Sequence, residues 1–133
     1  MPKELETIMD FLNANRIQIL STMDDNQPIS RPIGSAMLFK DRIFFCMNND
    51  KPMYSQLERN PRVCICVCAS DFSWIRIMAR ANFIDDKEAK AIYIKRPTSS
   101  FKSVDDPRLS VFYLSDITAQ IYIKGKLNEI KVP

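Results

Sequence analysis

The chain has 133 residues, of which 46% are apolar and 26% are charged, as in an ordinary soluble globular protein. This length predicts one domain over residues 1–133, large enough to form a core without disulfide or metal staples. The net charge of +3 is small and spread along the chain, so it allows an anionic ligand without calling for nucleic acid. No apolar run approaches the about 18 residues of a membrane span, and the first residues lack a signal peptide's apolar core. We therefore expect a cytoplasmic protein.

The first elements of the chain are an expected helix and strand. Residues 3–15 place apolar side chains at helical spacing with acidic residues between them. These apolar positions are Leu5, Ile8, Met9 and Leu12. Residues 16–23 alternate and are rich in strand-forming residues, and the polar residues 24–26 then form a turn. An amphipathic helix therefore leads into the first strand.

The second expected strand, residues 28–39, contains Pro28, Pro32 and Gly34. Proline cannot donate a hydrogen bond to a sheet, so it occurs at strand starts, edges and bulges. Gly34 indicates a bulge or a close approach of the backbone. The pattern fits an edge strand that resists aggregation, and it fits equally a backbone kept open for a ligand.

A third strand and a short helix follow. Residues 42–47 (RIFFCM) form an apolar strand that ends in a polar loop, residues 48–51. Pro52 favours the start of a helix over residues 52–59, and Asp50 is placed to cap it. The next strand, residues 63–69, is apolar on both faces, as a barrel strand covered on both sides would be.

The second half of the chain begins with a long alternating strand, residues 74–84. Its two faces carry Trp74, Arg76, Met78 and Arg80 on one side and Ile75, Ile77, Ala79 and Ala81 on the other. The remaining elements are a helix over residues 85–93, a polar loop over 96–107, and strands over 110–114 and 118–124. Six or seven strands, mostly joined by hairpins, predict a mainly β protein with short helices, built as a small antiparallel barrel.

Cysteine and histidine usage limits the chemistry. Cys64, Cys66 and Cys68 lie two apart in one strand, where side chains on one face stand about 6.7 Å apart, too far to share one zinc ion. We therefore expect no metal there and interpret these residues as small core side chains. Histidine is absent, which removes the commonest neutral-pH general base and metal ligand. Chemistry must come from a cofactor, from carboxylates, or from Tyr, Cys and Lys.

Two cations flank the hairpin between residues 30 and 61. Arg31 stands in one expected strand, and Lys51 stands just before the expected helix that begins at Pro52. A helix N-terminus presents unpaired N–H groups, and an arginine can hold phosphate oxygens with two hydrogen bonds. This combination suits a phosphate group, although solvated surface charges would give the same pattern.

Four motifs occur in order along the chain: QPISRPIG (27–34), FFCMN (44–48), KPMYSQLERNP (51–61) and WIRI (74–77). With them, nearly the whole chain resembles the FMN-binding split-barrel proteins related to pyridoxamine 5′-phosphate oxidase. It is most similar to the small bacterial group that includes the Nim nitroimidazole-resistance proteins. The resemblance implies a six-stranded antiparallel split β-barrel of Greek-key topology. It also implies a homodimer that holds one FMN in each of two clefts between the subunits.

The resemblance also implies eight cofactor-binding residues: Arg31, Pro32, Ile33, Gly34, Cys46, Met47, Lys51 and Trp74. Arg31 and Lys51 would hold the phosphate, and the backbone of residues 32–34 would run beneath the isoalloxazine ring. Cys46 and Met47 would line the ribityl and phosphate end. Trp74 would contact the flavin of the other subunit. Gln56 occupies a family-like helix position, where a purely structural role is an equal alternative.

The chain departs from the family pattern in four respects. Met47 stands where many relatives carry a threonine, and Ala79 replaces a frequent glycine. The C-terminal substrate motif of true pyridoxamine phosphate oxidases is absent, which argues against vitamin B6 oxidation. The histidine typical of Nim proteins is absent as well, which argues against nitroimidazole reduction.

The expected function is that of an FMN-dependent oxidoreductase acting on an unidentified small molecule. The flavin would supply the redox chemistry, and NAD(P)H or another reduced flavin would supply electrons. Tyr54 and Tyr113 are candidate proton donors, but neither is assigned a catalytic role. One alternative is a non-catalytic module that binds flavin or haem for storage, sensing or electron relay. Another is a small barrel that binds single-stranded nucleic acid. Arg76 and Arg80 beside Trp74 hint at such a surface, but it lacks further exposed aromatic rings.

Overall fold

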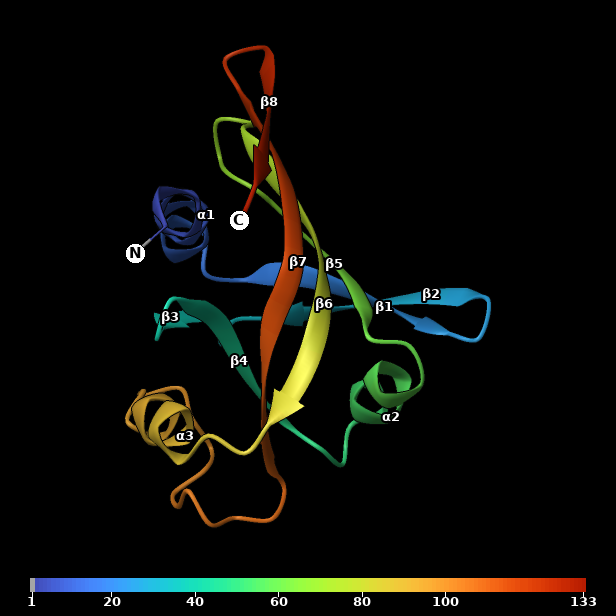
Figure 1. Ribbon diagram of the computed structural model, residues 1–133, viewed down its shortest axis with the longest axis vertical. Coiled ribbons are helices and arrows are strands. Elements are labelled where there is room, and N and C mark those ends of the chain that lie inside the picture. The colour runs from blue at the N-terminus through green and yellow to red at the C-terminus, as the bar shows by residue number, and fades with distance from the viewer. Residues whose placement is uncertain (1) are drawn as a thin grey trace.

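The computed structural model describes residues 2–133, which form a curled antiparallel sheet with three helices around it (Figure 1). The helices within this part of the chain are α1 (Lys3–Ala14), α2 (Pro52–Arg59) and α3 (Lys87–Ile94). The strands are β1 (Gln18–Asp24), β2 (Gln27–Ile33), β3 (Met37–Phe39), β4 (Arg42–Asn48), β5 (Arg62–Cys68), β6 (Trp74–Ile84), β7 (Leu109–Ile123) and β8 (Lys126–Lys131). Among these residues no helix is long and apolar enough to cross a membrane.

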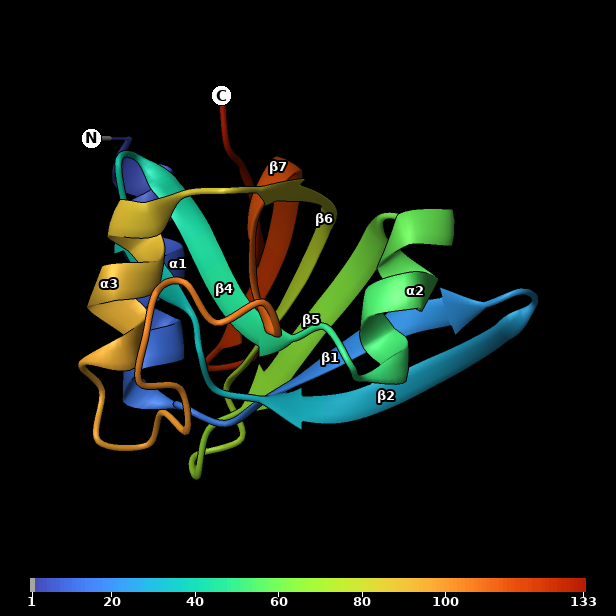
Figure 2. The same ribbon diagram turned by 90° about the horizontal axis from the view of Figure 1, so that it is seen from below.

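The strand order is β2-β1-β5-β6-β7-β4-β3, and β8 pairs with the far half of β7. Every pairing is antiparallel. Figure 2 shows α1 and α3 on one side of the sheet and α2 beside β1 and β2 on the other. This arrangement leaves the start of α2 close to the ends of β2 and β4, where the functional residues are expected.

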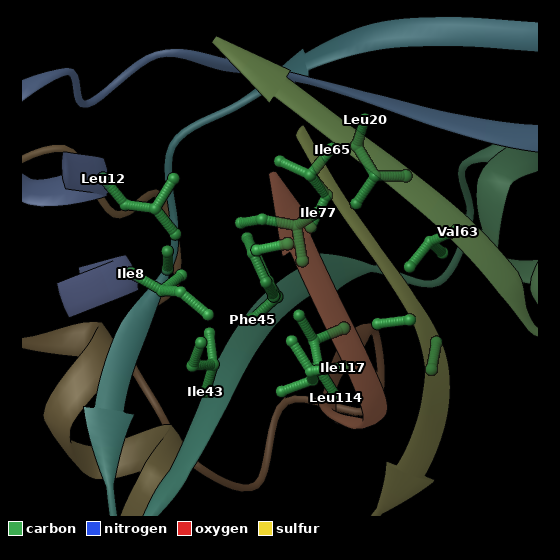
Figure 3. Close-up of a cluster of buried hydrophobic side chains, with 14 of the residues drawn as sticks. Ile8, Leu12, Leu20, Ile43, Phe45, Val63, Ile65, Ile77, Leu114 and Ile117 are labelled. Atoms are coloured by element: carbon green, nitrogen blue, oxygen red, sulfur yellow. The ribbon is translucent and has the colours of Figure 1, made fainter. Parts of the chain in front are cut away.

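The main core lies inside the curl of the sheet (Figure 3). Phe45, Ile65 and Ile77 are fully buried there, and Ile8 and Leu12 of α1 close one end. Burying one such side chain contributes about 1.5–3 kcal/mol, so this cluster is a large favourable term in folding. The mainly β class and the amphipathic first helix are confirmed.

The two faces of β6 are those that the alternation predicted. Ile75, Ile77, Ala79 and Ala81 are all buried. Their neighbours Trp74, Arg76, Met78 and Arg80 are half-buried or exposed on the outer face. The period-2 pattern therefore assigned the inner face of the sheet correctly.

Two expected strand boundaries are wrong. The expected strand 28–39 is two strands, β2 and β3, because residues 34–36 leave the ladder between them. The two expected closing strands are one continuous strand, β7, in which Asp116 (φ 51°) lies opposite the register shift between Met78 and Arg80. A β-bulge, rather than a turn, accommodates the polar residues there.

The hairpin to β8 was not predicted. Lys124 (φ 53°) and Gly125 (φ 77°) form a two-residue turn with both φ angles positive, which matches the twist of a hairpin. The strand itself is polar and largely exposed, so its sequence carries no alternating apolar signal. With it, the described sheet has eight strands rather than six or seven.

The interpretation of the cysteines needs correction. Cys46 is buried, but Cys64 is half-buried and Cys66 and Cys68 are exposed. Val63 and Ile65 take the inner face of β5, so alternation turns the cysteines outward. β5 is therefore covered on one face in this chain, not on both.

Candidate functional site

A cavity of about 460 Å³ lies between β2, β4 and the start of α2. We call it the Arg31 cavity. Six of the eight expected cofactor-binding residues line it: Arg31, Pro32, Ile33, Cys46, Met47 and Lys51. Residues 20 positions apart in sequence therefore line one cavity.

A second cavity of about 570 Å³ adjoins the first, because Ile33 and Cys46 line both. We call it the Arg96 cavity. Gly34, the seventh expected residue, lies in its wall together with Arg16, Tyr93 and Arg96. The two cavities thus form neighbouring parts of one hollow, with cations at both ends.

Arg31 reaches the first cavity from β2 and is held by neutral groups. Its Nη2 donates to Oε1 of Gln56 at 2.9 Å, and its Nη1 donates to the carbonyl of Leu20 at 3.2 Å. Partial burial lowers the pKa of this guanidinium from its ordinary value. Within residues 2–133 no carboxylate lies within salt-bridge distance of Arg31. A partly desolvated cation without an anionic partner favours binding of an anion.

Gln56 and Thr22 support Arg31 from the core side. The hydroxyl of Thr22 donates to Oε1 of Gln56 at 2.6 Å, and both side chains are buried. α2 turns Met53, Gln56 and Leu57 toward the sheet because these positions share one helical face. From the sequence, Gln56 was predicted only as a family-like position, and Thr22 was not predicted at all. The signal for Gln56 is its position three residues after the buried Met53, which places it on the same inward face of the helix.

Lys51 is the N-cap residue of α2, and Pro52 is the first helical residue. No side chain caps this helix, so the expected cap by Asp50 is wrong. The backbone N–H of Asp50 instead donates to Oδ1 of Asn48 at 2.8 Å, within the loop that precedes the helix. An uncapped helix N-terminus beside two cations adds to the positive potential of the Arg31 cavity.

Residues 34–36 form a clamped link between β2 and β3. A Cβ on Gly34 would lie 3.0 Å from the carbonyl oxygen of Arg16, a tight contact that favours glycine there. The Ser35 hydroxyl bonds to both backbone groups of Cys46, at 2.9 and 3.1 Å. Arg96 donates to the carbonyls of Gly34 and Ala36 at 3.3 and 2.9 Å. The close approach at Gly34 is thus made by the chain itself, and β2 is also an edge strand.

Cys46 and Met47 differ from Arg31 in being buried in apolar clusters. Burial raises the pKa of the Cys46 thiol to about 12, so this thiol stays protonated at neutral pH. A protonated thiol is a poor nucleophile, and Cys46 acts as an apolar wall between the two cavities. Among the described residues no group of three or more His, Cys, Asp and Glu side chains could hold a metal ion.

Trp74, the eighth expected residue, lines neither cavity. Its ring stacks on Tyr122 with centroids 5.8 Å apart, and Arg76 lies over it at 5.1 Å. These residues belong to the outer face of β6 and β7. One chain therefore does not bring Trp74 to the other seven residues.

Fold and site together define a small antiparallel β protein with a cationic hollow at one end of its sheet. A family model described as pyridoxamine 5′-phosphate oxidase matches residues 5–115. The chain belongs to this family. No curated protein matches the sequence closely enough to count as a relative.

Solved structures with the same fold come from several bacteria. A NimC/NimA family protein from Clostridium acetobutylicum is 25% identical with a TM-score of 0.90, covering 98% of this chain and 93% of that one. A pyridoxamine 5′-phosphate oxidase-related, FMN-binding protein from Nostoc punctiforme is 13% identical with a TM-score of 0.63, covering 100% and 98%. A heme binding protein from Mycobacterium smegmatis is 15% identical with a TM-score of 0.77, covering 98% of this chain and 59% of that one.

Proposed function

We propose that the chain, as one domain over residues 1–133, binds FMN and acts as an FMN-dependent oxidoreductase on a small molecule. The observation that carries this proposal is the partly buried Arg31, which lines a cavity with Lys51 and has no carboxylate partner among the described residues. A dianionic phosphate would supply that partner. Membership in a family with an FMN-binding relative supports the choice of flavin.

The residues present fit the two ends of FMN. Arg31, Lys51 and the uncapped start of α2 would hold the phosphate, with Cys46 and Met47 beside the ribityl chain. The backbone of Pro32, Ile33 and Gly34 would lie beneath the ring. When bound, the flavin supplies hydride and electron transfer, and the protein supplies orientation and electrostatics.

A second copy of the chain would complete the site as a homodimer, in a split barrel of the six-stranded kind. Its support is the outer sheet face, where large apolar side chains lie uncovered beside Arg76 and Arg80. Ile19 pairs with Cys66, and Cys64 pairs with Met78, so these side chains share one face. Ile19 and Met78 are 43% and 40% exposed, which is unusual for large apolar residues in a sheet interior. Trp74 lies on this face and would reach the partner's flavin.

The substrate would enter the Arg96 cavity, next to the expected ring position. Arg16, Arg96 and Tyr93 line this cavity, so it favours a substrate that carries negative charge or hydrogen-bond acceptors. NAD(P)H is the proposed electron donor, and the cytoplasm is the proposed location.

The experiment is a titration of FMN with purified protein, followed by quenching of flavin fluorescence. We expect one FMN per chain, and anaerobic addition of NAD(P)H should bleach the bound flavin. Arg31→Ala and Lys51→Ala should each weaken FMN binding by more than about tenfold, or about 1.4 kcal/mol. If neither change alters the affinity, the phosphate lies elsewhere.

A non-catalytic binding module is the second candidate, because a heme binding protein shares the fold. The chain has no histidine, so haem would need Cys, Met or Tyr as its axial ligand. Titration with hemin gives the readout. A sharp Soret band with no FMN binding would favour haem, and bound flavin that NAD(P)H never bleaches would favour a non-catalytic flavin carrier.

A further inference from the structure

Gln56 is the centre of the hydrogen-bond network behind Arg31. Its side chain is 5% exposed and lies in the wall of the Arg31 cavity. Oε1 receives two hydrogen bonds, from Thr22 at 2.6 Å and from Arg31 at 2.9 Å. A guanidinium can only donate, so the atom that faces Arg31 must be the amide oxygen. Gln56 therefore fixes the position of Arg31 through an acceptor of known identity.

The Gln56 oxygen that accepts from Arg31 is neutral, so it leaves the charge of Arg31 free to attract an anion. Charged groups removed from water are normally paired with an opposite charge. Here the two acceptors of Arg31 are an amide oxygen and the Leu20 carbonyl, neither of which carries a charge. Lys51, in the same cavity wall, adds charge of the same sign. The positive charge of the cavity therefore remains available to a ligand.

Gln56 also has a donor to offer. Nε2 makes no hydrogen bond with any residue of the described chain 2–133, whereas Oε1 on the other side of the amide is doubly engaged. The orientation set by Thr22 and Arg31 thus leaves the N–H groups of Nε2 without a partner among the described residues. A glutamate at this position could receive the same two hydrogen bonds, but it would neutralise Arg31 and lose the donor.

We propose that Gln56 determines the selectivity of this site for a phosphorylated ligand, holding Arg31 in place while leaving its charge to the phosphate. This inference rests on the proposed function, because the phosphate in question is that of FMN. Thr22 is a positioning residue that acts through Gln56. The role differs from simple packing, since a packing role depends on shape and not on the charge of the side chain.

The test compares FMN with riboflavin, which has the same ring and ribityl chain but no phosphate. Fluorescence-quenching titrations of the full chain give both affinities. Gln56→Glu is nearly isosteric and should weaken FMN binding by about 100-fold, while riboflavin binding changes by less than about threefold. Ser55→Glu is the control, because it adds the same charge at an exposed neighbouring position of α2 outside the cavity wall. We expect it to change neither affinity by more than about threefold.

Each result decides the question. Unchanged FMN affinity in Gln56→Glu would overturn the inference, as would an equal loss of FMN and riboflavin. If Gln56→Glu does not fold, Gln56→Met replaces it, because it keeps the length of the side chain and removes the acceptor. That variant should weaken FMN binding by about tenfold and leave riboflavin unchanged, and an unchanged FMN affinity would contradict us. A wild-type protein that binds neither flavin would instead overturn the proposed function, and this inference with it.

Discussion

The Arg31 cavity and the outer face of the sheet differ in how many of the expected site residues a single chain brings together. In the cavity, β2, β4 and α2 of the same chain bring together two cations, a helix start and a buried amide that orients Arg31. On the outer face, Trp74 stacks on Tyr122 with Arg76 over its ring, and Ile19 and Met78 on the same face are exposed. In the proposed site, one chain would therefore supply the phosphate end, and a second copy would complete the ring end.

The largest effect should come from breaking the phosphate end. Arg31→Ala removes the cation and leaves Oε1 of Gln56 with Thr22 alone, so FMN affinity should fall by more than about tenfold. Riboflavin affinity should stay within about threefold of wild type, because riboflavin lacks the phosphate. Parallel fluorescence titrations measure both, and an equal loss for the two flavins would place Arg31 outside the phosphate site.

Breaking the outer face should affect assembly. Met78→Asp puts a charge at the middle of the expected interface and should shift the protein from dimer to monomer in sedimentation velocity. Flavin affinity should fall about tenfold, because the partner's Trp74 is lost. Ile92→Asp on α3 is the matched control, since both side chains are 40% exposed in one chain. Equal behaviour of the two variants would rule out this face as the interface.

A smaller effect is expected in the link between β2 and β3, residues 34–36. Gly34→Ala places a methyl group 3.0 Å from the Arg16 carbonyl, so the backbone must shift. We expect a loss of about 1 kcal/mol in the free energy of unfolding, or about 4 °C in melting temperature. Differential scanning calorimetry measures it, with Gly125→Asn as a comparison at a turn that tolerates asparagine. An unchanged melting temperature would mean that the backbone at residues 34–36 accommodates a methyl group without cost.

The smallest effect concerns the wall between the cavities. Burial raises the pKa of Cys46 from 9.0 to about 12, so the unfolded chain releases this proton at lower pH than the folded chain does. The unfolded state therefore binds fewer protons between pH 9 and pH 12, and stability contributed by Cys46 is lost as pH rises through that window. Urea unfolding from pH 8 to pH 10.5 should show a steeper decline for wild type than for Cys46→Ala. Identical slopes would show that the thiol is hydrated.

The sequence predicted the inner faces of the sheet well, because periodicity reports burial directly. Ile75, Ile77 and Ala79 alternate in the sequence and are buried in the fold. Strand ends were harder, since they depend on contacts made elsewhere. The break after Ile33 falls where the Arg16 carbonyl approaches Gly34, and β7 runs on through a bulge at the register shift between Met78 and Arg80. In both cases the contacting residue is distant in the sequence: Arg16 from Gly34, and Arg80 of β6 from the bulge in β7.

The candidate site could be predicted only in part for the same reason. Arg31 and Lys51 carry motif and charge signals, and they line one cavity. Thr22 carries no such signal, because its role arises from a buried hydrogen bond to a residue 34 positions away. The outward cysteines were misread because burial preference was applied without the alternation of β5. The outer face of β5 carries these cysteines and is nevertheless uncovered in one chain.

The central claim is that this family member binds FMN through its phosphate. Isothermal titration of the wild-type protein with FMN, and then with riboflavin under the same conditions, tests it most directly. We predict one FMN per chain and an affinity for FMN at least about tenfold above that for riboflavin. Equal affinities for the two flavins, or no binding heat and no fluorescence quenching with FMN, would contradict it.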